Sequence, residues 1–212
     1  MHKKEKANKI TELLEKRYPQ TECGLNWEGD PYRLLIMAIL SAQCTDARVN
    51  IVAKTLFARF PTPYDMAKAE LSEIEQEIHS VGLYRSKAKA LKECCVRLTE
   101  VYGGKLPSKM EELLTLRGVG RKVANLLRGD VFGLGGIVAD THCIRISGRL
   151  GLSNGKDPLK TERDLEKLIP REKQSGYCHR MVLFGREICT ARSPKCGECE
   201  LNEFCINKDK QG

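Results

Sequence analysis

The sequence of 212 residues lacks a long apolar run. No apolar stretch approaches the roughly 20 residues that a membrane-spanning helix needs; the longest extends from Leu34 to Leu40. The first residues, MHKKEKANK, are charged and lead into no apolar segment of the kind found in secretory signals. We therefore expect a soluble cytoplasmic protein with no membrane partner, and we predict that Leu34–Leu40 belongs to a buried helix.

The sequence also lacks internal repeats, low-complexity segments and runs with clean strand alternation. Two Asp-Pro pairs, Asp30-Pro31 and Asp157-Pro158, place an N-cap before a proline at the first helical position. Apolar residues recur at helical spacing, for example Ile10, Leu13, Leu14, Leu71, Ile74 and Ile78. These patterns predict an all-α fold of about ten helices.

Positive charge exceeds negative charge along the chain. The formal net charge is +8 and the sequence pI is near 9.0. Such a balance favours a polyanionic partner, above all nucleic acid, although a merely solvated basic surface would have the same composition.

Cysteine is abundant, with ten residues. A disulfide scaffold is typical of short secreted chains. This chain is not short, and we do not expect it to be secreted. Six cysteines are scattered, and most of these lie in apolar-periodic segments where we expect small core residues: Cys23, Cys44, Cys94, Cys95, Cys143 and Cys178.

The other four cysteines are concentrated in CTARSPKCGECELNEFC, with the spacing C-x6-C-x2-C-x5-C: Cys189, Cys196, Cys199 and Cys205. A four-cysteine zinc site usually pairs two C-x2-C knuckles, and only one is present. A [4Fe–4S] cluster tolerates uneven spacing and is favoured over zinc. Four unliganded thiols are the remaining alternative. Between the first two cysteines, Arg192 and Lys195 are either solvated charges or part of a loop that faces DNA.

A glycine-rich hairpin separates two helical segments in LLTLRGVGRKVANLL. The first segment is predicted to end at Leu116 and the second to begin near Arg121, and the hairpin between them is Arg117, Gly118, Val119 and Gly120. Glycines permit positive φ and close approach of a ligand to the backbone. The amides that open the second helix can bind one phosphate, so the hairpin is either an anion site or a plain turn.

Lys122 lies in the first turn of the second helix. The positive end of the helix dipole and the neighbouring Arg121 both favour a neutral amine there, which a lysine nucleophile requires. The simpler interpretation is a surface lysine that contacts phosphate.

Asp140 and His142 follow in VADTH. Asp140 is either an N-cap or a carboxylate that stabilises positive charge at a reacting sugar. His142 is either structural or a pocket residue able to transfer a proton.

Several stretches in the same order resemble the endonuclease III family of DNA glycosylases and abasic-site lyases, within the helix–hairpin–helix superfamily. These stretches are LLIMAILSAQCTDARVN, VGLYRSKAKAL, LRGVGRKVANLL, VADTH with RLGL, and the cysteine tail. They cover the chain from about residue 30 to its end.

The resemblance implies a two-lobed helical fold. One lobe is a six-helix barrel at residues 24–134, with the helix–hairpin–helix at about 109–132. The other is a discontinuous helical domain, residues 1–23 and 135–212, whose cluster loop spans 189–205. The resemblance also implies an active site in the groove between the lobes and base-excision repair of DNA in the cytoplasm, at the nucleoid.

By the family's motifs, Lys122 is the Schiff-base nucleophile and Asp140 its carboxylate partner. Gln43 matches the residue that fills the gap left by an extruded nucleotide, and Leu83 the one that wedges into the base stack. Gly118 and Gly120 match the phosphate-binding loop, and the four C-terminal cysteines match the ligands of the [4Fe–4S] cluster. The expected partner is duplex DNA that contains damaged pyrimidines or abasic sites, bound by a monomer.

Three positions depart from the family's pattern. Arg117 stands where proline is typical, Gly148 where asparagine is usual, and Cys44 where a small apolar residue such as alanine is common. These departures leave the preference among lesions open.

Other functions are compatible with parts of the pattern. An adenine-mismatch glycosylase of the same superfamily also carries a cluster, but it lacks the nucleophilic lysine and usually has a further C-terminal domain, which we do not expect here. A thymine- or uracil-mismatch glycosylase would have the same fold. A non-catalytic DNA-binding iron–sulfur module would leave Lys122 and Asp140 unexplained.

Overall fold

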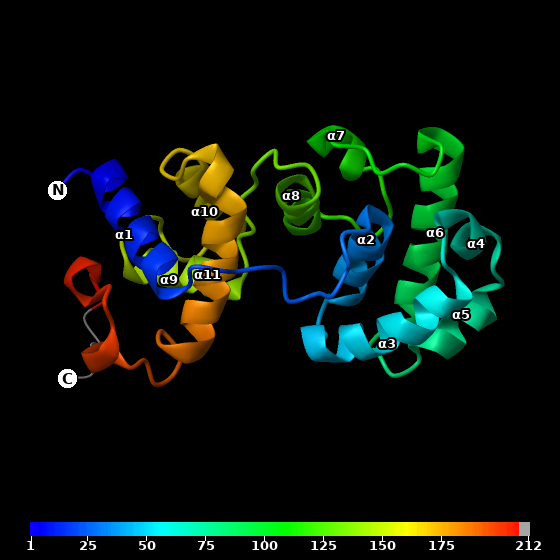
Figure 1. Cartoon of the computed structure of the whole chain (residues 1–212), viewed down its shortest axis with the longest axis horizontal. Helices are drawn as coiled ribbons and strands as arrows, with labels where there is room; N and C mark the ends of the chain where they lie inside the picture. Colours follow the sequence, from blue (N-terminus) through cyan, green and yellow to red (C-terminus); the bar gives the residue numbers. More distant parts are fainter. Residues whose placement is uncertain (208–212) are drawn as a thin grey trace. The chain divides into compact units, whose positions relative to one another are not determined.

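The computed structural model describes residues 1–207, which form helices, turns and loops without a strand (Figure 1). The predicted all-α fold is thereby confirmed; the last five residues of the predicted second domain lie outside the described residues. No helix within 1–207 is both long and apolar enough to cross a membrane. The α-helices are α1 (Lys3–Arg17), α2 (Pro31–Leu40), α3 (Asp46–Arg59), α4 (Pro63–Lys68), α5 (Leu71–Ile78), α6 (Tyr84–Tyr102), α7 (Met110–Leu113), α8 (Arg121–Asp130), α9 (Thr141–Arg149), α10 (Pro158–Glu166) and α11 (Gln174–Glu187), and the 3-10 turns are η1 (Arg171–Lys173), η2 (Cys196–Glu198) and η3 (Asn202–Phe204).

The chain divides into two compact units. The continuous unit, Cys23–Phe132, contains α2 to α8. The discontinuous unit joins Met1–Glu22 to Gly133–Gly212 and contains α1 together with α9 to α11. Each unit has its own apolar core.

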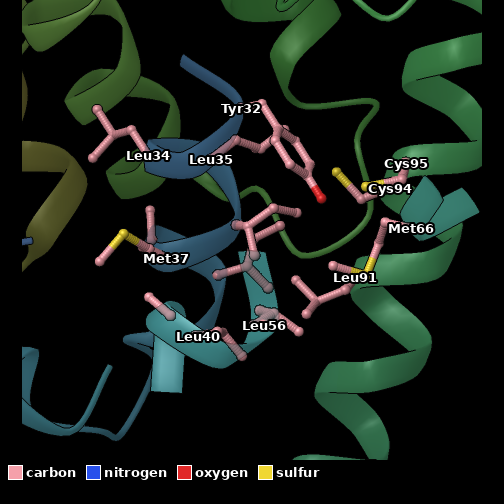
Figure 2. Close-up of a cluster of buried hydrophobic side chains, with 14 of the residues drawn as sticks. Tyr32, Leu34, Leu35, Met37, Leu40, Leu56, Met66, Leu91, Cys94 and Cys95 are labelled. Carbon is pink, nitrogen blue, oxygen red and sulfur yellow. The ribbon is translucent and has the colours of Figure 1, made fainter. Parts of the chain in front are cut away.

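Helix α2 lies at the centre of the continuous unit. All of its residues except Pro31 and Arg33 are buried, as the apolar run predicted. The helix contacts α3, α6 and α8, and Figure 2 shows its side chains meeting Leu56 of α3 and Leu91 of α6. The ring of Tyr32 meets that of Phe57 edge-on at 5.6 Å between centroids, and its hydroxyl donates to the Phe60 carbonyl at 3.1 Å.

Both predicted Asp-Pro starts are confirmed. Asp30 accepts a hydrogen bond from the Tyr32 amide at 2.9 Å and begins α2. Asp157 accepts from the Lys160 amide at 2.5 Å and begins α10. In each case the carboxylate satisfies an amide that has no partner within the helix.

The discontinuous unit holds the N-terminal helix against the C-terminal helices (Figure 1). Glu187 at the end of α11 accepts from the Arg17 guanidinium at 2.7 Å and from the Tyr18 hydroxyl at 2.5 Å. Lys173 pairs with Glu15 at 3.0 Å. The core between α1, α9 and α11 includes Ile10, Leu14, Cys143, Tyr177, Met181 and Phe184. Polar bonds at the rim and apolar burial within thus join segments that are distant in the sequence.

The scattered cysteines are mostly core residues, as predicted. Cys94, Cys95, Cys143 and Cys178 are buried, and burial raises the pKa of the Cys94 thiol to about 12. Cys44 is half-buried against the core of the continuous unit, so its thiol occupies the packing position of a small apolar side chain.

Candidate functional site

The predicted hairpin connects α7 to α8 in the continuous unit. The first helix is shorter than predicted, because it ends at Leu113 rather than Leu116. The amides of Thr115 and Leu116 bond three residues back, each at 3.1 Å, which is the spacing of a tight turn. Leu116 remains buried, so its apolar character misled the prediction of the helix end.

Glycine occurs at the two hairpin positions for different physical reasons. Gly118 has a φ of +83°, and a Cβ there would lie 3.0 Å from Cγ2 of Ile39. Gly120 is the N-cap of α8 with a φ of −94°, and a Cβ there would meet no atom within 4 Å. The fold therefore requires glycine at 118 but not at 120, while Val119 between them is buried and anchors the turn.

The first turn of α8 offers an anion site. No side chain caps this helix, and its opening amides follow Gly120, which is exposed. Uncapped amides and the positive end of the helix dipole favour a negative group, and the missing side chain at Gly120 leaves space for one.

Lys122 is exposed in this first turn of α8. The helix is held by the opposite face, where Ala124 and Leu127 are fully buried and Val123 and Leu126 are partly buried. Packing on that face fixes the direction in which the Lys122 side chain leaves the helix, and it leaves the amine accessible to a ligand.

Arg117 does not extend freely into solvent. Its Nε lies 3.6 Å from Oε2 of Glu93 on α6, and both side chains are largely exposed. An exposed pair of this kind contributes little to stability. Its consequence is that Arg117, in the place of the usual proline, has a partner within the protein.

Gln43 and Leu83 share an unusual backbone conformation. Their φ angles are +54° and +61°, in the left-handed region that residues with a side chain rarely adopt. Both residues are exposed, and the apolar side chain of Leu83 is 62% exposed. Two strained loops thus present a polar and an apolar side chain at the surface of the continuous unit.

In the discontinuous unit, Asp140 is the N-cap of α9. Its Oδ1 accepts a hydrogen bond from the Cys143 amide at 2.7 Å, so the N-cap interpretation is confirmed. This bond restricts the carboxylate to one orientation, which a catalytic role of the same group would also need.

His142 packs between α9 and α11. Its Nδ1 lies 3.2 Å from Nη2 of Arg145 and accepts that bond, because a guanidinium can only donate. A Cβ at Gly185 would lie 2.4 Å from this Nδ1, so the absence of a side chain at Gly185 admits the ring. Burial lowers the pKa of His142 and the charges of Arg145 and Arg186 lower it further, while Asp140 raises it.

The C-terminal cysteines lie in a loop that α9 holds in place. Arg145 donates to the carbonyls of Gly185 and Cys189 at 3.2 and 2.8 Å. Arg149 donates to the sulfur of Cys189 at 3.2 Å and to the carbonyls of Thr190 and Ala191 at 2.7 and 3.0 Å. The sequence analysis did not identify either arginine as a residue of this site, although their i, i+4 spacing places them on one face of α9.

The donor set of this loop fits an iron–sulfur cluster. All four thiols are half-buried and outside any disulfide. Burial raises the pKa of Cys199 to about 11, with smaller contributions in the same direction from the nearby Cys189 and Cys205. Within residues 1–207 no three His, Cys, Asp or Glu side chains are grouped closely enough to hold a metal ion.

Two further residues predicted in this loop, Arg192 and Lys195, are exposed. The structure explains why glycine stands at position 148 on α9: a Cβ there would lie 2.6 Å from Cα of Gly155. An asparagine at 148 would therefore displace the loop around Gly155.

Comparison with known proteins identifies the family. Residues 36–171 match the model of the HhH-GPD superfamily of base excision DNA repair proteins, and residues 189–205 match the iron–sulfur binding domain of endonuclease III. The endonuclease III of Synechocystis sp. is 46% identical over 204 residues, which are 96% of this chain and 93% of the relative. The chain belongs to the endonuclease III family. The resemblance inferred from the motifs is thereby confirmed, and so is the [4Fe–4S] cluster as its cofactor.

Solved structures agree with this family. A trapped covalent intermediate of endonuclease III with DNA is 42% identical, with a TM-score of 0.90 and coverage of 97% of both chains. A thermostable thymine-DNA glycosylase is 25% identical, with a TM-score of 0.84 and coverage of 95% of this chain and 96% of its own. Because both have this fold, the fold alone does not separate the endonuclease III family from the mismatch enzymes.

The hairpin glycines allow a first test. Gly118→Ala forces an alanine into the left-handed region against Ile39, and we expect a loss of about 1–3 kcal/mol in the free energy of unfolding. Gly120→Ala should lower the free energy of unfolding less than Gly118→Ala does, since its Cβ meets nothing and only the N-cap preference for glycine over alanine is lost. It should weaken binding to duplex DNA about tenfold by obstructing the phosphate. Chemical denaturation and fluorescence anisotropy measure the two effects. Equal losses of stability in both variants would contradict the assignment.

His142 allows a second test. Since burial and two guanidinium charges disfavour the imidazolium, we expect an NMR titration midpoint below the ordinary value of 6.5. Asp140→Asn should lower the midpoint further, because it removes the one neighbouring charge that favours protonation. A midpoint that rises in this variant would show that the Asp140 carboxylate does not favour protonation of the ring.

Proposed function

We propose that this protein is a bifunctional DNA glycosylase and abasic-site lyase that removes oxidised pyrimidines from duplex DNA. The observation that carries the proposal is an exposed amine, Lys122, in the first turn of a helix whose uncapped amides form an anion site. A phosphate bound at the hairpin would hold the neighbouring nucleotide within reach of that amine. The trapped covalent complex of a relative with DNA supports a covalent step for this chain as well.

Chemistry on a base within duplex DNA first requires its extrusion, because the sugar carbon to be attacked is not reachable in the stack. Leu83 supplies an apolar side chain that replaces part of the lost stacking, and Gln43 fills the gap opposite the orphaned base. Both are exposed, on loops whose backbone is strained, which suits side chains that act outside the protein's own core.

The amine of Lys122 then attacks C1′ with its nitrogen lone pair, forms a C–N bond and releases a proton. The glycosidic bond breaks, and its electron pair leaves with the base, which takes up a proton. Asp140 stabilises the positive charge that develops at the sugar. Opening of the sugar gives a Schiff base, which acidifies the C2′ proton; loss of that proton expels the 3′ phosphate by β-elimination and cuts the strand. Hydrolysis of the Schiff base releases the amine.

The [4Fe–4S] cluster would be held by Cys189, Cys196, Cys199 and Cys205, which need to bind as thiolates. When bound, it organises the loop that carries Arg192 and Lys195, and no step of the proposed reaction uses its electrons. Those two exposed cations then contact the DNA backbone, which positions the protein without reading sequence.

The net charge of +8 supports binding to the DNA backbone. One chain acting on one lesion requires only a monomer, and we assign the protein to the cytoplasm, where it would associate with the nucleoid. A mismatch glycosylase of the same fold is the alternative, and the family membership of the chain does not favour it. A panel of duplexes with oxidised or mismatched pyrimidines separates the two substrate classes.

Covalent trapping tests the nucleophile. Borohydride should reduce the Schiff base and link wild-type protein to abasic duplex DNA, so that a slower band appears on a denaturing gel. Lys122→Gln should abolish the band, because an amide cannot form a Schiff base. Lys109→Gln, an exposed lysine close to the hairpin in sequence, serves as the control and should trap normally. Trapping that persists in Lys122→Gln would remove the assignment of the nucleophile.

Metal content tests the cluster assignment. Protein purified without oxygen should contain about four irons per chain and show the brown colour of iron–sulfur proteins. Cys199→Ser should lower the iron content, whereas Cys94→Ser, at a buried core thiol, should not. Stoichiometric zinc without iron would reverse the assignment.

A further inference from the structure

Lys87 is a charged residue on the apolar face of α6. Its side chain is only 6% exposed, and Ala88 and Leu91 beside it are fully buried. The ammonium donates to the carbonyls of Leu40 at 2.9 Å and Ala42 at 2.7 Å. Burial lowers the pKa of this amine. Because burying a cation costs free energy, the two bonds are the feature that keeps Lys87 in this position.

The two carbonyls belong to the turn that carries Gln43. Leu40 ends α2, and its carbonyl has no partner within the helix, where a cation is also favoured by the helix dipole. Ala42 immediately precedes Gln43, whose φ is +54°. A bond to the Ala42 carbonyl restrains the peptide unit from which the left-handed residue departs.

The backbone of Lys87 is bonded to the second strained loop. Its amide donates to the carbonyl of Leu83 at 3.0 Å, the bond that opens α6. Leu83 has a φ of +61°, which is unusual for a bulky residue. One residue is therefore bonded through its backbone to Leu83 and through its side chain to the residues just before Gln43.

We propose that Lys87 is a positioning residue that fixes the spacing between Gln43 and Leu83, so that both side chains enter the DNA together. The inference rests on the proposed function, in which these two side chains replace the extruded nucleotide and its stacking. It assigns Lys87 no contact with DNA and no part in bond breaking. An error of about 1 Å in the placement of groups that act together can lower a rate about 100-fold.

Lys92 provides a matched control on the same helix. Its ammonium donates to the Ala69 carbonyl at 2.7 Å, at the end of α4. Lys92 is thus also a lysine of α6 bonded to a helix-terminal carbonyl, but it is bonded to neither strained loop. If such bonds contributed only to stability, removing the ammonium of either lysine would have the same effect. An effect on positioning would appear only when the Lys87 ammonium is removed.

The experiment compares Lys87→Met and Lys92→Met with wild-type protein on two abasic substrates. The first is a duplex with 2-aminopurine opposite the abasic site, whose fluorescence rises when the stack is opened. The second is a single-stranded oligonucleotide, which has no partner strand to displace. We expect Lys87→Met to slow the fluorescence rise about 10- to 100-fold on the duplex, and to cut the single strand at the wild-type rate. Lys92→Met should match wild type on both.

Equal duplex rates for the two variants would overturn the inference, as would a single-strand rate that falls as much as the duplex rate. If thermal melting shows that Lys87→Met does not fold, Lys87→Gln takes its place, since its side chain is polar but one atom too short to reach both carbonyls. If both Lys87 variants fail to fold, the role of Lys87 is structural stabilisation alone, and the inference is overturned. A wild-type protein that cuts neither substrate would overturn the proposed function itself.

Discussion

Burial of α2 is the constraint on which the continuous unit depends. A helix that is apolar on nearly all sides must be surrounded, and α3, α6 and α8 surround it. Burial also creates a need, because the carbonyls at the end of the helix lose access to water and require donors within the protein. Lys87 meets that need, and in doing so it connects α6 to the turn after α2.

Several residues of the continuous unit have positive φ angles, among them two exposed residues with side chains, Gln43 and Leu83. Gly118 takes this conformation without cost and turns the chain under Ile39, while Gln43 and Leu83 adopt it with side chains attached. Strain of this kind persists only where the surrounding structure holds it. In this unit α2 and α6 meet beside Gln43 and Leu83, so the packing of these two helices stabilises the strained backbone of the exposed loops.

In the discontinuous unit, guanidinium groups and apolar packing together hold the cysteine loop, whose Leu201 and Phe204 are buried in the core. The loop between Cys189 and Cys205 contains little regular structure. Its first carbonyls accept hydrogen bonds from Arg145 and Arg149 of α9. Arginine suits this purpose because its planar group offers several donors in a fixed arrangement. The same Arg145 also donates to Nδ1 of His142, so one guanidinium contacts both the loop and the imidazole ring.

Much of the site could be recognised in the sequence, because local chemistry determines it. The helical periodicity, the Asp-Pro starts, the glycines of the hairpin and the four cysteines with their spacing each have a meaning that holds without tertiary structure. The end of α7 was predicted wrongly because Leu116 is apolar and buried, yet lies in a turn, and apolar character does not distinguish the two.

The partners of charged groups were decided only by the tertiary structure. Lys87 lies in step with Leu91, Cys94 and Leu98 on the apolar face of its helix, a signal visible in the sequence, but the carbonyls that it binds are more than forty residues away. Arg117 pairs with Glu93, and Gly148 is required by Gly155. By itself the sequence determined the fold class and the family, and it named the candidate site residues. The tertiary structure decided which buried and strained groups hold those candidate residues in place, because hydrogen bonds and close contacts depend on distances in space that no spacing along the chain specifies.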